Sequence, residues 1–485
     1  MAKGLRSVRE CRPWIGEGRE TGWKKVLLAI KSTALVSGAV GLGCSLGTLL
    51  MTPFKELVVS SVSVWVSLFL TVANPLYGLM IAIITSPISA HFASIELGTG
   101  IPNATPDRTV VVSLLALLLC RAATSQEKSC HANVSVNLAT LLFLGGYALS
   151  FRNNYWPVNR AGSFLVDAWI LPMIICFVIS NLVVDRRTLD ITLNLLLLLG
   201  VYSALYMVYE QATGNVLFEV RSNVQHFYED TGLRIVRGLY GTTSIFGNLF
   251  NLLIPIDLYY LLKARTAGKK TWYFVAFVLM LVGVFFTYKR AVWLGMLLSF
   301  LIIQWFCVQS RKFLIPILLV FAVVIAASEM VRARITEIDA WQTAGGRTQR
   351  WDEGVETWKQ SPIFGGGFRS YEKEGRYTGV ENLYIHLLAS AGLFTFVPFI
   401  AMFLIILKKS IRVFRQAGDN QRLFVDRDLV TVFWGAFAAF LFMAYFGSGV
   451  ETQPISNYVL FTITGAIVGS QMPLLVESAR AAVTR

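Results

Sequence analysis

The residues with the clearest chemical potential lie in a polar, arginine- and aromatic-rich segment from Gly345 to Leu393, between long apolar runs. Within it, Glu381 directly precedes Asn382 at the expected start of an apolar helix. A carboxylate at such a position could be no more than a favourable charge at a helix N-terminus, worth a few tenths to about 1 kcal/mol. A carboxylate desolvated at the mouth of a helix bundle can also take a proton from a hydroxyl group. We therefore take Glu381 as the candidate catalytic base.

Four arginines form the second group of candidates. Arg290 follows an expected tight turn between two apolar runs, close to a membrane surface, where a charge must find water, lipid headgroups or an anionic ligand. For one arginine, a headgroup anchor is the simpler interpretation. Arg237, Arg347 and Arg350 are also expected in outward loops, and a cluster of guanidinium groups suits a diphosphate better than bulk solvent.

Aromatic and amide side chains lie close to these charges in the sequence. Trp351 is four residues after Arg347, and tryptophan beside a cation is typical of carbohydrate or lipid-phosphate pockets, although tryptophan is also common at membrane interfaces. Asn382 and His386 are four residues apart on one helical face and could line the same cavity. For His386, a hydrogen bond to a neighbouring helix would satisfy the ring without a catalytic role.

Composition then defines the class of protein that positions these residues. The chain has 485 residues, 55% hydrophobic and 15% charged, and a positive mean hydropathy, which is typical of a polytopic membrane protein. Because the apolar blocks are continuous, we expect an all-α bundle of about 12–14 transmembrane helices. The predicted spans are 26–50, 57–73, 76–91, 108–121, 137–151, 163–184, 189–208, 243–262, 272–287, 291–308, 313–331, 382–407, 429–446 and 455–475.

The distribution of charge orients this bundle. Basic residues gather at the N-terminus and in alternate short loops, and the positive-inside rule makes that side, with both termini, cytoplasmic. The net charge of +14 is therefore a topology signal, and nucleic-acid binding is an unnecessary explanation. The expected order is a basic tail (1–25), N-terminal helices (26–208), an outward loop (209–242), central helices (243–331), a large outward loop (332–381), C-terminal helices (382–475) and a cytoplasmic tail (476–485).

The large outward loop should contain a short helix. Trp351, Val355 and Trp358 recur at helical spacing from about Thr348 to Gln360, before Pro362 and the glycine run 365–367 break the pattern. Its apolar face would lie on the membrane surface or on the roof of the bundle, where it could act as a lid. The spacing of the cysteines and histidines indicates no outward disulfide and no metal site, and no cofactor is expected.

Three stretches resemble the O-antigen ligase and polymerase superfamily of bacterial membrane glycosyltransferases. They are Arg237-Gly238-Leu239-Tyr240-Gly241 through Asn248 to Pro255, the turn Thr287-Tyr288-Lys289-Arg290-Ala291, and Gly346-Arg347-x-x-x-Trp351 followed by Ser361-Pro362-Ile363-Phe364-Gly365-x-Gly367 and Glu381-Asn382-x-Tyr384. The order and spacing of these motifs over about residues 237–400 make the resemblance fairly specific.

The resemblance implies a glycosyltransferase-C-like bundle in the bacterial inner membrane with a large periplasmic catalytic loop. It implies undecaprenyl-diphosphate-linked glycans as donor and acceptor, membrane lipids as surroundings and no metal, and it leaves open a chain-length regulator as a further partner. By position, Arg290 and Arg347 would grip the diphosphate with Arg237 near the same pocket. The residues Arg350, Trp351, Asn382, Tyr384 and His386 would contact substrate.

One departure from the family pattern favours one activity within the superfamily over another. Where the family commonly has His before Asn, this chain has Glu381, which resembles polymerases of O-antigen or exopolysaccharide repeat units more than ligases that complete lipopolysaccharide by joining O-antigen to lipid A core. A ligase acting on lipid A core or protein is the nearest alternative. A lipid-linked oligosaccharide flippase is the alternative from another class, but a transporter should place charges at mid-membrane, whereas here they collect in outward loops.

Overall fold

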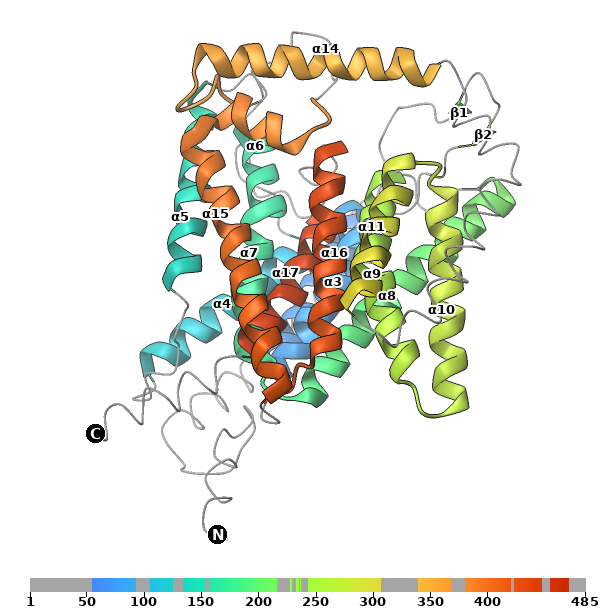
Figure 1. The fold of residues 1–485 in the computed structure, drawn as a ribbon. Coiled ribbons are helices and arrows are strands. Elements are labelled where there is room, and N and C mark those ends of the chain that lie inside the picture. The colour runs from blue at the N-terminus through green and yellow to red at the C-terminus, as the bar shows by residue number, and fades with distance from the viewer. Residues whose placement is uncertain are drawn as a thin grey trace.

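The chain forms an all-α bundle that is capped at one end by a single long helix (Figure 1). The structure is a computed structural model and describes residues 55–92, 105–124, 134–153, 158–215, 227–228, 233–234, 236, 243–306, 339–368, 380–419, 423–446 and 454–470. Beside the helices, the described residues hold one antiparallel pair of short strands, β1 (Phe227–Tyr228) and β2 (Leu233–Arg234).

The helices follow the predicted apolar runs closely. They are α2 (Lys55–Ala73), α3 (Pro75–Phe92), α4 (Pro106–Thr124), α5 (Val134–Leu149), α6 (Val158–Leu165), α7 (Leu171–Leu182), α8 (Arg186–Thr213), α9 (Thr243–Lys263), α10 (Ala267–Phe286), α11 (Arg290–Phe306), α14 (Asp339–Gln360), α15 (Leu383–Asp419), α16 (Arg427–Phe446) and α17 (Pro454–Gly469). A π-helical turn, Val166–Ile170, joins α6 to α7. Two predicted spans, 26–50 and 313–331, lie outside the described residues.

Six described stretches are long and apolar enough to cross a bilayer, and several shorter apolar helices accompany them. The six are Gly162–Leu182, Arg186–Thr213, Thr243–Lys263, Ala267–Phe286, Leu383–Ala417 and Arg427–Phe446. The protein is therefore a polytopic helical membrane protein, as predicted. The full count of 12–14 spans stays a prediction.

Helix α9 lies at the centre of the bundle, and nearly all of its side chains are buried. It packs against α8, α10, α11, α16 and α17. Glycines allow these close approaches: a Cβ on Gly247 would lie 2.2 Å from a Val292 methyl carbon, and one on Gly283 would lie 2.6 Å from the Phe250 ring. Small residues at helix contacts are the usual means of association where lipid removes the hydrophobic driving force.

A charged network ties the helices together at the end of the bundle remote from α14 (Figure 1). Arg186 donates to the Tyr259 hydroxyl at 2.5 Å, Tyr259 donates to Asp426 at 2.8 Å, and Lys263 pairs with Asp426 at 2.5 Å. Burial by itself raises the pKa of Asp426, but hydrogen bonds from Lys263, the Leu429 N–H and Tyr259 outweigh it and hold that pKa below its usual value. The basic residues at this end are those from which the sequence predicts a cytoplasmic face.

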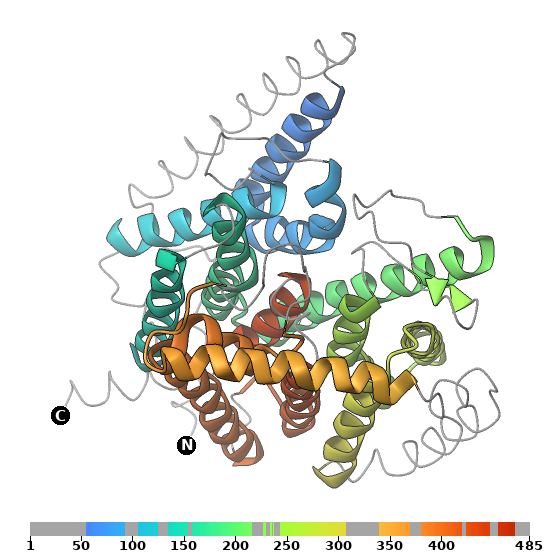
Figure 2. The same ribbon diagram turned by 90° about the horizontal axis from the view of Figure 1, so that it is seen from above.

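The opposite end is closed by α14, which runs over the bundle from the side of α10 and α11 to that of α15 (Figure 2). It is longer than the predicted helix, because it begins at Asp339, and it ends at Gln360 as expected. A Cβ on Gly354 would lie 2.7 Å from Ile385 and 3.2 Å from Val380. The sequence predicts that the apolar face of this helix lies either on the membrane surface or on the roof of the bundle. In the structure it lies on the roof.

Helix α15 is bent, whereas the sequence predicts one uninterrupted span over 382–407. Gly392 has φ 66° and ψ −171°, which breaks the helix. The carbonyls of Ala389 and Ser390 accept hydrogen bonds from Gly366 and Gly367, at 2.8 and 3.1 Å. On the other side of the break, the Leu393 and Phe394 N–H groups donate to the carbonyls of Pro362 and Ile363, both at 2.9 Å. Segment 362–367 therefore supplies the backbone hydrogen bonds that the bend removes.

Candidate functional site

The end of the bundle beneath α14 brings two of the predicted site residues into contact. Arg350 Nη1 of α14 lies 3.5 Å from Glu381 Oε1, which immediately precedes the start of α15. The Arg350 and Glu381 side chains are 23% and 37% exposed. The pair is therefore held by the packing of α14 on α15 and is still reachable from solvent.

Glu381 has an unusual backbone conformation. Its φ is 38°, in the left-handed region that costs a residue with a side chain about 1–2 kcal/mol. Its neighbours Val380 and Asn382 are each 1% exposed, so the flanking packing holds the turn in place. Strained residues of this kind gather at active sites and ligand clamps. The only other described residue besides glycine with a positive φ is Tyr288, two residues before Arg290.

Asn382 fixes the start of α15. Its Oδ1 accepts hydrogen bonds from the N–H groups of Tyr384, at 3.0 Å, and Ile385, at 3.1 Å, as an N-cap side chain does. Because Asn382 is almost fully buried, these bonds hold Glu381 just outside the helix. The structure thus gives Asn382 a positioning role, and direct contact with substrate stays a prediction.

Replacing Asn382 separates these two roles. We expect Asn382→Ala to lower stability by about 1 kcal/mol through the lost cap, whereas Asn382→Ser retains a capping oxygen and should unfold at nearly the wild-type temperature. The measurement is thermal unfolding of the purified protein in detergent. Equal destabilisation by Ala and Ser would contradict the capping role, and a stable Asn382→Ser variant without activity would show that the amide contacts substrate.

An aromatic group flanks the Arg350–Glu381 pair. The ring centroids of Trp351 and Tyr445 lie 5.4 Å apart, and those of Tyr384 and Tyr445 lie 6.5 Å apart. Tyr384 donates its hydroxyl to the Leu441 carbonyl at 3.0 Å, so it is anchored to α16. The indole nitrogen of Trp351 is buried and has no hydrogen-bond partner in the described part of the chain. A buried indole N–H usually has one, so Trp351 offers a donor for a ligand oxygen next to Arg350.

His386 lies deeper and faces a neighbouring helix. Its Nε2 is 3.5 Å from the Tyr147 hydroxyl of α5 and 3.5 Å from Ser390 Oγ. The ring of Phe368 meets it edge-on, with centroids 5.8 Å apart. Of the two interpretations given by the sequence, these contacts favour the hydrogen bond to a neighbouring helix.

Arg290 is the first residue of α11, and that end of α11 lies on the α14 side of the bundle (Figure 1). Its side chain is exposed, and no ion pair of Arg290 is found among the described residues. The preceding turn is well fixed, because Tyr288 is 5% exposed and Lys289 donates to the Ser244 hydroxyl. Burial raises the pKa of the Tyr288 hydroxyl. An exposed arginine at a helix N-terminus is suited to an anion.

The side chains of two predicted arginines lie outside the described part of the structure. Arg237 lies outside the described residues, as does the side chain of Arg347. The backbone of Arg347 belongs to α14, three residues before Arg350. Helical spacing therefore puts Arg347, Arg350 and Trp351 toward one side of α14.

Charged residues also lie inside the bundle, and the sequence analysis singled out only Asp257 among them, as an acidic residue within an apolar run. Arg108 of α4 binds both carboxylate oxygens of Asp167 in the π-helical turn, at 2.7 and 2.5 Å, and Tyr458 of α17 donates to the buried Asp107 at 3.2 Å. Asp257 of α9 is fully buried, and neither carboxylate oxygen has a hydrogen-bond partner in the described part of the chain. The expectation that charges collect in outward loops is therefore incomplete, and Asp167 inside an apolar run was the signal available for the pair with Arg108.

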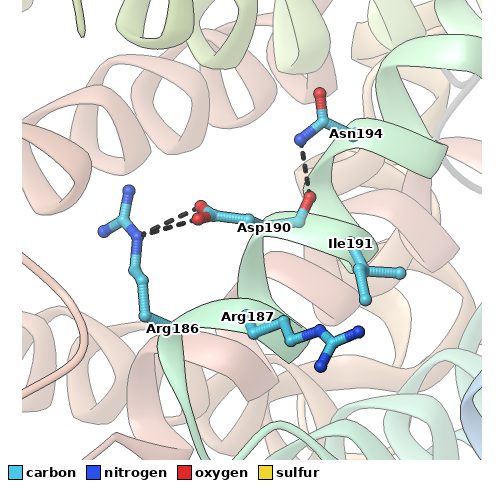
Figure 3. Close-up of a pocket in the computed structure, with 5 residues that line it drawn as sticks. All are labelled: Arg186, Arg187, Asp190, Ile191 and Asn194. Carbon is cyan, nitrogen blue, oxygen red and sulfur yellow. Dashed lines mark hydrogen bonds and ion pairs between the residues drawn. The ribbon is translucent and has the colours of Figure 1, made fainter.

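An open hollow of about 660 Å³ at the other end of the bundle is separate from this site. It is lined by Arg186, Arg187, Asp190, Ile191 and Asn194 of α8. Figure 3 shows Arg186 turned toward Asp190, with the Arg187 side chain directed away from that pair. Because α8 begins at the end remote from α14, the hollow is no part of the Arg350–Glu381 site.

Comparison with known proteins gives one result. Residues 275–400 match a family model described as O-antigen ligase. The match runs from within α10 to just beyond the bend of α15 and contains every predicted site residue except Arg237. No curated protein matches the chain.

Proposed function

We propose that this protein is a polysaccharide polymerase of the O-antigen ligase and polymerase superfamily, which the family match at residues 275–400 supports. It transfers a glycan from undecaprenyl diphosphate to a lipid-linked O-antigen or exopolysaccharide repeat unit on the periplasmic face of the inner membrane. The observation that carries the proposal is the solvent-reachable contact of Arg350 with Glu381 at a strained turn. It provides a base and an anion-binding group within one site.

The reaction assigns a role to each charged group. An acceptor sugar hydroxyl attacks the anomeric carbon of the donor, its proton passes to Glu381, and the bond from the anomeric carbon to the diphosphate oxygen breaks with its electron pair on that oxygen. Arg290, Arg347 and Arg350 stabilise the diphosphate as its charge develops. Direct attack inverts the anomeric centre, whereas retention would require a covalent glycosyl-enzyme. None of these steps uses a metal or a cofactor.

The Arg350–Glu381 pair also provides a resting state for the base. Its atoms are 3.5 Å apart and both side chains are partly exposed, and such pairs typically contribute only about 0–1 kcal/mol. A diphosphate carries more charge than one carboxylate and accepts bidentate hydrogen bonds from a guanidinium group. The incoming donor would therefore draw Arg350 away from Glu381 and release the carboxylate from this contact, toward the acceptor hydroxyl.

This partner exchange predicts the behaviour of Arg350→Met. The variant should bind the lipid-linked donor about tenfold more weakly, because one charge-assisted contact is lost, and raise KM more than it lowers kcat. Steady-state kinetics with purified protein measures both. Lys359→Met, which removes an exposed cation paired with Glu356 on the same helix, is the matched control. A loss confined to kcat would contradict the partner exchange, because it would mean that Arg350 acts only on the charge that develops during reaction.

Glu381 is also what favours polymerase over ligase, because the family commonly has His at this position. The test is to supply purified protein in nanodiscs with a lipid-diphosphate-linked repeat unit and no other acceptor, and to resolve products by length. We expect a ladder of lipid-linked polymer. Consumption of substrate only after lipid A core or an acceptor protein is added would move the assignment to ligase.

A second candidate is a flippase for lipid-linked oligosaccharide. The observation in its favour is the partly buried Arg108–Asp167 pair together with the fully buried Asp257, since transporters concentrate ionisable residues inside the bundle. Arg108 and Asp167 satisfy each other, however, and such pairs also occur as structural links between helices. The contact of Glu381 with Arg350 of α14 has no counterpart in the transport hypothesis, so we prefer the transferase.

A further inference from the structure

Five large apolar side chains lie exposed together at the bend of α15. Ile363 and Phe364 are 57% and 59% exposed, Leu393 and Phe394 are 40% and 41% exposed, and Val397 is 58% exposed. We call these five residues the bend patch. Grouped exposure of this kind on a protein marks a binding or membrane-contact surface.

Backbone hydrogen bonds hold the bend patch in place. The Phe394 N–H donates to the Ile363 carbonyl, and the Leu393 N–H donates to the Pro362 carbonyl, both at 2.9 Å. The rings of Phe364 and Phe394 then meet with centroids 5.6 Å apart. Main-chain atoms form the hydrogen bonds between segment 362–367 and the bend of α15. The Ile363 and Phe364 side chains are not needed for this contact and project outward.

The bend patch continues a lipid-facing surface. Leu393, Val397 and Leu404 fall on one face of α15, and Leu404 is 59% exposed on a helix apolar enough to span the bilayer. The neighbouring α5 exposes Leu141 and Leu149, 65% and 57%. Ile363 and Phe364 therefore stand at the α14 end of an apolar stripe that runs along α15 and α5.

The outer face of helix α14 is polar, in contrast to the apolar bend patch. Its inner face packs on the bundle through Gly354 and Trp351, and Asp352, Glu353, Glu356 and Lys359 are exposed. The change from polar to apolar exposure falls between Lys359 and Ile363, immediately after the helix. Such a change is expected where a chain passes from water into the membrane interface.

We propose that the bend patch inserts into the bilayer leaflet on the α14 side and anchors segment 362–367 in the membrane. The occupant is lipid, because the patch continues the membrane-facing surface of α15 and α5. The anchor fixes the C-terminal end of α14 at the depth of the membrane interface. This inference does not depend on the reaction that the protein catalyses.

Spin labels test the depth of the patch. Phe364→Cys, Leu404→Cys and Glu356→Cys are each made in a cysteine-free variant, labelled with a nitroxide and reconstituted in nanodiscs. Continuous-wave EPR then compares collision with oxygen, which concentrates in lipid, and with a water-soluble nickel chelate. We expect the label at 364 to favour oxygen, as at 404, and the label at 356 to favour nickel. A label at 364 that favours nickel would overturn the proposal, and so would one shielded from both, which would indicate a second copy or another protein on the patch.

A second measurement uses the unaltered chain, so that it does not depend on folding of the variants. The protein is reconstituted with a phosphatidylcholine that carries a photoreactive diazirine on its acyl chain, illuminated and analysed by peptide mass spectrometry. Adducts should form on Ile363 or Phe364 and on Leu404, and none on residues 352–359. Adducts on Leu404 without any at 363–364 would contradict lipid contact.

Discussion

Glu381→Gln is expected to reduce polymer formation by about 10²–10⁴-fold, the usual contribution of a general base, while the protein stays inserted and folded. Glutamine keeps the shape of the side chain and can still accept a hydrogen bond from Arg350, so the strained turn at φ 38° is preserved. What is lost is the ability to take a proton from the acceptor hydroxyl. The initial rate of lipid-linked product formation by purified protein measures the effect.

The matched control for this variant is Glu356→Gln. Glu356 lies on α14, is 63% exposed and pairs with Lys359. The Glu356→Gln variant therefore removes a carboxylate from the same region without changing the proposed site. We expect wild-type rates from it. If Glu381→Gln polymerised as fast as Glu356→Gln, the assignment of the base would be wrong.

Gly392→Ala should release segment 362–367 from the bend of α15. A Cβ at this position would lie 2.3 Å from the Ile363 carbonyl oxygen and 2.4 Å from its carbon, both backbone atoms that cannot turn aside. The left-handed φ of 66° adds about 1–2 kcal/mol for any residue with a side chain. Each of the four docking hydrogen bonds contributes about 1 kcal/mol, so with the backbone cost we expect a local loss on the order of 5–6 kcal/mol.

Hydrogen–deuterium exchange shows where that loss falls. The amides of Gly366, Gly367, Leu393 and Phe394 should lose protection in Gly392→Ala, and activity should fall because α14 is no longer held at its C-terminal end. Gly145→Ala in α5, where an added Cβ meets nothing within 4 Å, is the control and should behave as wild type. Unchanged protection at these amides would contradict the account of the bend.

The apolar runs predicted the helices well because continuous hydrophobicity over a bilayer thickness is a local property of the chain. The bend of α15 is not local. It depends on hydrogen bonds with segment 362–367, which ends 25 residues before Gly392. In the sequence, glycines are the only sign of the bend at either place. Helix α14 was predicted too short for a related reason. The prediction was made from apolar residues at helical spacing, and residues 339–348 are helical without that spacing.

The candidate site was predicted in part. The grouping of arginines in outward loops pointed to Arg350, and the motif at the expected helix start pointed to Glu381. The structure brings these two together through the packing of α14 on α15. Sequence could not distinguish an asparagine that binds substrate from one that caps α15, because both uses place Asn382 directly before Leu383. The Arg108–Asp167 pair was missed because the two residues are 59 positions apart, and an arginine at the edge of an apolar run is also consistent with an interfacial anchor.

The most direct test of the central claim, glycosyl transfer at the α14 end of the bundle, is whether the protein breaks the bond between glycan and lipid diphosphate. Proteoliposomes that contain only this protein and one lipid-diphosphate-linked repeat unit are sampled over time for free lipid diphosphate and for intact donor in each leaflet. The account predicts release of one lipid diphosphate for each glycosidic bond formed, lost in Glu381→Gln and retained in Glu356→Gln. Intact donor that crosses the bilayer without any released lipid diphosphate would contradict it and make the protein a transporter.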